Sequence, residues 1–172
     1  MHLLQTALLI LFPILVITGG LRDLVSYIIP NWISAALVLT FVPAAFALGL
    51  PLNVMGVNLA VAGVALVAAV IMWTLGWIGG GDAKLFAATA LWIGWPSALD
   101  YLLVTGVAGG ALAMCLLGLR SLWVRPYVQS GPAWFRRLAT PDENVPYGVA
   151  IAIGAMWAFP GSALVHALQT QA

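Results

Sequence analysis

Two aspartates stand out in a chain that carries very little charge. Asp82 follows three glycines in the stretch IGGGDAKLFA (78–87), and Asp23 lies in LRDLVSYIIPNW (21–32). Two carboxyls held a few ångströms apart resist ionising together and come to share one proton. The ionised member can deprotonate a water molecule, while the protonated member stabilises the charge that develops on a carbonyl oxygen. Such a pair would hydrolyse a peptide bond without a metal ion or a nucleophilic side chain.

The composition predicts an integral membrane protein. Hydrophobic residues make up 63% of the 172 residues, and only 6% are charged. A soluble domain carries about 25% charged residues, which solvate its outer surface. This chain has too few polar groups for that, so lipid must replace water over most of its surface. The formal net charge of +1 gives no electrostatic support for a nucleic-acid partner.

The apolar runs predict a single domain built as a bundle of about six transmembrane helices, an all-α fold. About 20 apolar residues cross the hydrocarbon core as a helix. The Gly-, Pro- and Asn-containing stretch 49–58 separates two of these runs, and Gly94 and Pro96 mark a turn after a short one. The predicted spans lie near 3–20, 31–49, 59–78, 83–98, 101–119 and 146–167.

The basic residues set the expected orientation. With six spans all of them fall on one side of the membrane, which the positive-inside rule assigns to the cytoplasm. These residues are Arg22, Lys84, Arg120, Arg125, Arg136 and Arg137. Asp23 then follows the cytoplasmic end of the first span, and Asp82 precedes the fourth span at the same depth. Both termini are expected outside.

The other acidic residues do not offer a second pair at this depth. The chain holds five acids. Asp142 and Glu143 lie in the polar loop, and Asp100 is expected on the outer side. A single aspartate near a helix end also has a simpler use, and Asp82 would cap the start of a helix well. From these residues alone, a catalytic pair and two helix caps both remain open.

The loop 120–145 is the only extended polar stretch. Its four arginines are interleaved with aromatic residues, among them Trp123, Trp134 and Phe135. This mixture suits a segment that lies on anionic lipid headgroups. An ordinary connecting loop with aromatic anchors at the membrane surface explains it equally well.

The residues around Asp82 have candidate roles of their own. Gly79, Gly80 and Gly81 lack side chains, so the backbone there can approach a substrate closely and adopt φ > 0. An extended substrate strand would be able to pair with that backbone. Lys84 either favours ionisation of the acid pair through its positive charge or simply anchors the chain at the cytoplasmic surface.

Three separated motifs resemble those of one protein family. GGGDAKL (79–85) resembles the Gly-x-Gly-Asp signature of intramembrane aspartic proteases, with the continuation usual in prepilin peptidases. RDLVSYIIPNWIS (22–34) resembles the first-aspartate motif of that family, and VPYGVAIAIGA (145–155) resembles its final-helix motif. The resemblance covers essentially the whole chain and is closest to the short form found in bacterial tight-adherence (Flp) pilus systems.

The resemblance implies a fold, an activity and a partner. It implies six transmembrane helices in the bacterial inner membrane, with Asp23 and Asp82 as a catalytic pair on the cytoplasmic side. The implied reaction is endoproteolytic removal of the short basic leader from prepilin and pseudopilin precursors, with membrane lipid as the surrounding medium. Pro30 and Asn31 fit the start of a helix that holds Asp23 in place, and Pro146, Tyr147 and Gly148 are expected to play a similar part.

No cofactor or metal ion is expected. The long form of the family has an N-terminal insertion with zinc-binding cysteines and also methylates the new N-terminus, whereas this chain has one cysteine, Cys115. Methyl transfer is therefore not expected here.

A membrane scaffold or small transporter, with aspartates that cap helices or bind a cation, remains the alternative from another class. A protease of the signal-peptide-peptidase type is disfavoured because Arg22, not tyrosine, precedes Asp23.

Overall fold

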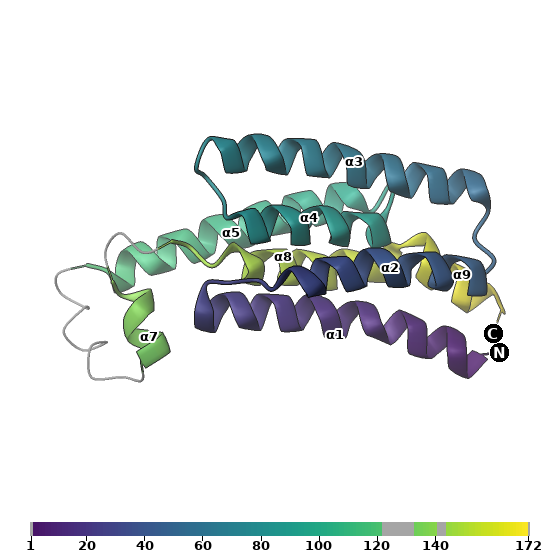
Figure 1. The fold of residues 1–172 in the computed structure, drawn as a ribbon, viewed down its shortest axis with the longest axis horizontal. Coiled ribbons are helices and arrows are strands. Elements are labelled where there is room, and N and C mark those ends of the chain that lie inside the picture. The colour runs from purple at the N-terminus through teal and green to yellow at the C-terminus, as the bar shows by residue number, and fades with distance from the viewer. Residues whose placement is uncertain (1, 122–132, 141–143, 172) are drawn as a thin grey trace.

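A computed structural model describes residues 2–121, 133–140 and 144–171, and every regular element in those residues is helical (Figure 1). The helices are α1 (His2–Ser26), α2 (Asn31–Ala47), α3 (Leu52–Thr74), α4 (Gly80–Ile93), α5 (Ala98–Leu119), α7 (Ala133–Leu138), α8 (Tyr147–Ala158), the 3-10 turn η1 (Phe159–Gly161) and α9 (Ala163–Gln171). The prediction of an all-helical chain is confirmed for these residues.

Four segments in the described residues are long and apolar enough to cross a membrane. They are α1, α3, α5 and the run from Tyr147 to Gln171 that comprises α8, η1 and α9. The apolar helix α2 has 17 residues, and α4 has 14. Fourteen residues of helix reach only about 21 Å, which is less than the roughly 30 Å of the hydrocarbon core. The helices and their apolar character indicate a membrane protein, and the count of six spans stays a prediction.

Several helix boundaries differ from the limits of the predicted spans. The stretch 49–58 was expected to be a connection, yet α3 begins at Leu52. The reason lies at Asn58, which is 1% exposed and donates from Nδ2 to the Leu91 carbonyl oxygen at 3.0 Å. A buried polar group requires a hydrogen-bond partner, and Asn58 finds one on α4, so it is compatible with the middle of an apolar helix.

The fourth helix also begins earlier than expected, at Gly80 instead of residue 83, and ends at Ile93. Its first turn therefore contains two of the three glycines and Asp82 itself. The predicted turn after it is confirmed, because Gly94 has φ +64°. That left-handed conformation is one that glycine adopts at no steric cost.

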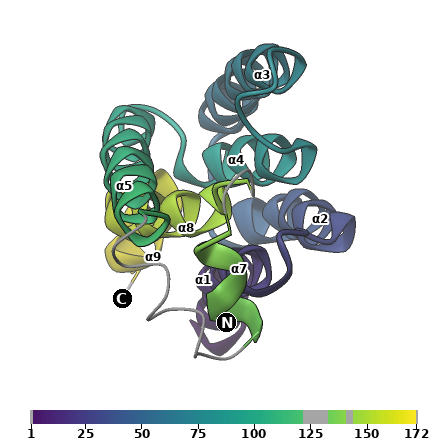
Figure 2. The same ribbon diagram turned by 90° about the vertical axis from the view of Figure 1, so that its left-hand side faces the viewer.

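The helix α4 lies inside the bundle and contacts α2, α3 and α8 (Figure 2). Its Trp92 has no exposed surface, and the indole Nε1 donates to the Leu37 carbonyl oxygen on α2 at 2.7 Å. The rings of Phe12 and Phe41 lie 5.4 and 5.9 Å from the Trp92 ring, between centroids. This aromatic cluster fixes α4 against α1 and α2, and so fixes the direction in which its first turn projects.

The helices α1 and α8 approach each other closely at Gly20. A Cβ atom at that position would lie 3.0 Å from both the Gly148 carbonyl oxygen and the Ala152 Cβ atom. Small residues allow two membrane helices to come together in this way. The close approach brings the end of α1, with Asp23, to the first turn of α8.

The loop 120–145 contains α7 in its described part. Arg120 follows the last residue of α5 and donates to the backbone carbonyl oxygens of Leu138 at 3.0 Å and Asn144 at 3.1 Å. These bonds hold both ends of the described loop residues near α5. Trp123, Arg125, Asp142, Glu143 and the side chains of Trp134 and Phe135 lie outside the described part, so the proposed contact with lipid headgroups stays a prediction.

Candidate active site

The fold brings the two aspartates together at one end of the bundle. Asp23 lies in the last turn of α1 and Asp82 in the first turn of α4. The Asp23 side chain is 5% exposed and the Asp82 side chain is 6% exposed. The two carboxyls are near enough for the charge of Asp23 to act on Asp82. Two acids that are remote in the sequence therefore form one buried pair.

A backbone amide at the start of α8 lies beside the two carboxyls. The Gly148 N–H donates to Asp23 Oδ2 at 2.7 Å, and its proximity also favours the ionised form of Asp82. This amide belongs to the first turn of α8, where N–H groups have no partner within their own helix and the helix dipole is positive. The start of α8 therefore stabilises negative charge at the point where the acids meet.

The two oxygens of Asp82 have different surroundings. Asp82 Oδ2 accepts a hydrogen bond from the Gly79 N–H at 3.1 Å. Asp82 Oδ1 is buried and has no hydrogen-bond partner within the described residues. The aspartate thus caps α4 with one oxygen, as the simpler interpretation predicted, and keeps the second oxygen available. Capping and catalysis are compatible here because they use different oxygens.

Asp82 also lines a cavity. Asp82 lines a space of about 420 Å³ together with Phe86 of α4, Thr105 of α5 and Tyr147 of α8. A space of this volume exceeds what one water molecule needs. Burial, followed by the negative charge of Asp23, raises the pKa of Asp82 from 3.8 to about 7. A carboxyl with that pKa holds its proton near neutral pH and can donate it.

The glycines before Asp82 lack the left-handed backbone that the sequence suggested, and their pairing with a substrate strand stays a prediction. None of Gly79, Gly80 and Gly81 has a positive φ, so that part of the prediction was wrong. Their small size is used inside the protein instead. A Cβ atom at Gly81 would lie 3.1 Å from the Ile29 Cβ atom, and one at Gly80 would lie 3.4 Å from the Trp73 indole nitrogen. The glycines allow neighbouring side chains to approach the first turn of α4.

The sequence interpretation missed Ile29 as a positioning residue. Its side chain is 7% exposed and packs against two glycines of the site. A Cβ atom at Gly148 would lie 3.0 Å from Ile29 Cδ1, and a Cβ atom at Gly81 would lie 3.1 Å from Ile29 Cβ. Ile29 therefore packs against the first turns of both α4 and α8. Ile29 directly precedes Pro30 and Asn31, two residues of the same motif to which the sequence analysis gave a role.

Pro30, Asn31 and Lys84 support the site from outside it. Pro30 occupies the N-cap position of α2, and Asn31 is the first residue of that helix. Both residues thus stand at the start of a helix, as expected; the Asn31 side chain does not cap α2, and its Oδ1 accepts a hydrogen bond from Lys84 Nζ at 2.9 Å. Lys84 is exposed and links the first turns of α4 and α2. Its suggested influence on the acid pair stays a prediction.

The residues that begin α8 lie beside the acids. Pro146 is buried at the N-cap position, and Tyr147 is half-buried with its ring against Gly109 of α5. Tyr147 lines the same cavity as Asp82. No group of three or more His, Cys, Asp or Glu that could hold a metal ion occurs in the described residues.

The chain matches one known family. The model of the type IV leader peptidase family matches residues 10–114, more than half of the chain, and this range includes Asp23 and Asp82. No curated protein and no solved structure matches the chain significantly. Pro146, Tyr147 and Gly148 lie beyond the matched range, and the tertiary structure brings them to the two acids. With both aspartates inside the match, the chain belongs to the type IV leader peptidase family.

Proposed function

We propose that this protein is an aspartic endopeptidase in which Asp23 and Asp82 form the catalytic pair. Its substrates would be type IV prepilins of the Flp type and related pseudopilins, from which it removes the short basic leader. The family match supports a leader peptidase. The observation that carries the catalytic assignment is the pairing of two buried carboxyls beside the start of α8, where Asp23 Oδ2 accepts from the Gly148 N–H and Asp82 Oδ1 has no partner in the described residues.

The two carboxyls have different parts in the proposed mechanism. Asp23 is ionised, and the Gly148 N–H stabilises its charge at Oδ2. Asp82 is protonated, because burial and the neighbouring charge favour its neutral form. Asp23 takes one proton from a water molecule as the water oxygen attacks the peptide carbonyl carbon. Asp82 gives its proton to the carbonyl oxygen, so the tetrahedral intermediate is neutral.

Collapse of this intermediate completes the proposed cycle. The carbon–nitrogen bond breaks as the proton on Asp23 passes to the leaving nitrogen, and Asp82 recovers a proton from the hydroxyl group that becomes part of the new carboxyl. The products are a peptide acid and a free amine, and the pair returns to one shared proton. Neither a metal ion nor a covalent intermediate takes part in these steps.

The distribution of basic residues supports a cytoplasmic position for the pair. Arg22 and Lys84 lie beside the two aspartates in the sequence. Arg120 bonds to the end of α7, and Arg137 of α7 lies over the ring of Tyr27 at 5.2 Å from its centroid, next to the end of α1. These cations gather at the same end of the bundle, and the positive-inside rule assigns that end to the cytoplasm.

The proposed function is tested by direct detection of the product. The protein, reconstituted in bilayers, is incubated with a Flp-type prepilin that carries its leader and its apolar helix. Mass spectrometry of the product is expected to show loss of the leader alone, through one new N-terminus. A precursor that stays intact with correctly folded and inserted protein would contradict the proposal.

The rate of cleavage is expected to depend on pH through Asp82. Its pKa is raised to about 7, so its proton is present below that pH and lost above it. Above pH 7 the rate should fall about tenfold for each pH unit, as the fraction of protonated Asp82 falls. A pH profile of kcat measures this, and a rate that keeps rising to pH 9 would contradict the assigned acid.

The same shift gives a stability prediction with a defined sign. The folded protein holds a proton on Asp82 that the unfolded chain loses above pH 3.8, so the free energy of unfolding should fall as the pH rises from 3.8 towards about 7. The variant Asp82→Asn should lack this part of the slope. Thermal unfolding in detergent across this pH range makes the comparison.

A further inference from the structure

Two cavities of about 420 and 430 Å³ adjoin each other between α3 and α5, with α4 as their floor. Figure 2 shows how these three helices are arranged. The cavities share Phe86 of α4 and Leu102 of α5 among their lining residues. The first cavity is the one that Asp82 lines, and the second is lined by Ala90 of α4 and by Trp95. We call the two adjoining cavities together the α3/α5 groove.

The dimensions of the groove suit one helix. Its floor, α4, has 14 residues, which corresponds to a length of about 21 Å. Its edges are apolar and exposed: Val64 on α3 is 72% exposed and Leu102 on α5 is 55% exposed. In a membrane these edges face lipid, so an apolar helix can enter the groove sideways from the bilayer.

One wall of the groove allows a helix to approach closely. Gly106, Gly109, Gly110 and Ala113 of α5 line its inner part. A Cβ atom at Gly106 or at Gly110 would meet no other atom within 4 Å. These two glycines therefore fill no space inside the protein, unlike Gly81 and Gly148. Small residues without an internal neighbour are typical of a surface that packs against another membrane helix.

The polar groups of the groove lie at its inner end. Asp82 Oδ1 and Thr105 Oγ1 are both buried without a hydrogen-bond partner in the described part of the chain, and both residues line the same cavity. A buried polar atom without a partner is destabilising. The occupant must therefore be apolar along most of its length and must present polar groups, such as those of a peptide bond, next to Asp82.

We propose that the α3/α5 groove is the docking site for the apolar helix of the precursor. The helix enters from the lipid, packs against Gly106 and Gly110, and places the peptide bond that precedes it beside Asp82 Oδ1. This inference rests on the proposed function, because it assumes that the substrate is a precursor with an apolar helix. The groove selects that substrate class, since its apolar cavity adjoins the cavity that Asp82 lines.

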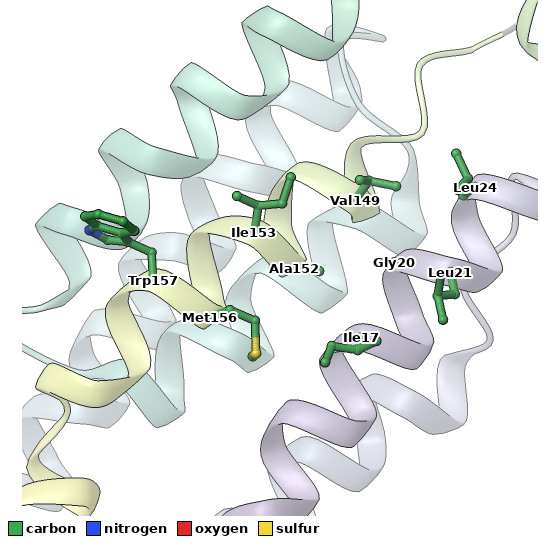
Figure 3. Close-up of a pocket in the computed structure, with 9 residues that line it drawn as sticks. All are labelled: Ile17, Gly20, Leu21, Leu24, Val149, Ala152, Ile153, Met156 and Trp157. Atoms are coloured by element: carbon green, nitrogen blue, oxygen red, sulfur yellow. The ribbon is translucent and has the colours of Figure 1, made fainter.

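Two other apolar grooves lack such a connection. One lies between α1 and α8, has a volume of about 470 Å³ and is lined by residues such as Leu21, Ile153 and Trp157 (Figure 3). The other lies between α2 and α3, has a volume of about 730 Å³ and includes Gly63 and Lys84. Neither aspartate lines either space. A lipid chain suffices to fill them.

Cross-linking tests which groove holds the helix. Cys115 is the only cysteine of the chain and is exposed, so a Cys115→Ser background carries no thiol. Gly106→Cys, Gly63→Cys and Ile153→Cys then place one thiol in each of the three grooves. The partner is a Flp-type prepilin with one cysteine in its apolar helix, and Asp23→Asn prevents its cleavage. Disulfide formation is expected at Gly106→Cys above both other positions. Equal or stronger cross-linking at either of the others, or none at all, would overturn the proposal.

Blocking the groove tests its part in catalysis. Gly106→Leu and Gly110→Leu add a side chain in the path of the helix without touching either aspartate, and each should raise KM at least about tenfold with little change in kcat. Gly63→Leu, in the α2/α3 groove, and Gly118→Leu, at an open position on α5, are the matched controls and should behave like wild type. If the wild type cleaves and Gly106→Leu cleaves equally well, the docking site is refuted and the proposed function stands. If wild type does not cleave, the proposed function itself fails.

Discussion

Replacement of either aspartate by asparagine is expected to lower the rate of precursor cleavage at least about a thousandfold. Asparagine has nearly the volume of aspartate, and its amide oxygen can still accept the hydrogen bond from the Gly148 N–H or the Gly79 N–H. The amide neither takes a proton from water nor gives one to a carbonyl oxygen. Asp23→Asn removes the base and Asp82→Asn removes the acid, so both variants should fold and insert but leave the precursor uncut.

Asp100→Asn is the matched control for these two variants. Asp100 is an exposed acid in the first turn of α5, and its replacement changes the net charge by the same amount. Its cleavage rate should stay within about twofold of wild type, since a substitution at an exposed residue away from the site has little effect. Mass spectrometry gives the rates, and thermal unfolding in detergent shows whether each variant is folded. Full cleavage by either Asp23→Asn or Asp82→Asn would refute the assigned pair.

The second large effect is expected at Gly148, a residue that has no side chain to take part in catalysis. A Cβ atom there would lie 2.8 Å from the Asp23 Cβ atom and 2.9 Å from Asp23 Oδ2. Real Cβ atoms do not approach other atoms so closely, so Gly148→Ala must displace Asp23 or the first turn of α8. A displacement of about 1 Å in a catalytic group costs roughly a hundredfold in rate. We expect Gly148→Ala to reduce kcat by about this factor.

The control for Gly148→Ala is Gly161→Ala in η1, the turn that follows α8. A Cβ atom at Gly161 would lie 2.8 Å from Ser97 Oγ, which is as close as the approach at Gly148, and neither aspartate is near it. Overpacking of this kind costs about 1–3 kcal/mol at either position. Thermal unfolding should therefore show similar losses of stability for both variants. Only Gly148→Ala should lose activity at a temperature where both are folded, and equal activities would contradict the role of Gly148 in positioning Asp23.

The part of the candidate site contributed by α8 lies beyond the residues that the family model covers. The match ends at residue 114, whereas the amide that donates to Asp23 belongs to Gly148. Gly20 of α1 permits this contact, because α8 lies against α1 with no room for a larger side chain at that point. A substitution that separates α1 from α8 would therefore affect the pair without changing either acid.

The sequence by itself predicted the class of protein, its all-helical character and the two acids as a candidate pair. Long apolar runs, scarce charge and punctuating glycines and prolines are properties of residue type and order, so they can be recognised without a fold. The turn at Gly94 and the start of α2 at Asn31 were predicted for this reason. The beginnings of α3 and α4 were missed, because Asn58 and the glycines before Asp82 are usual in loops and are accommodated in helices here by tertiary contacts.

Only the tertiary structure decided how the acids are held and which atoms remain available. The donor that holds Asp23 is a backbone N–H, a group that every residue except proline carries, so no pattern of side chains indicates it. Similarly, Gly81 and Gly148 accommodate Ile29 within the protein, whereas Gly106 and Gly110 face an open groove. Identical residues act differently because the space beside a glycine is set by helices that are distant in the sequence.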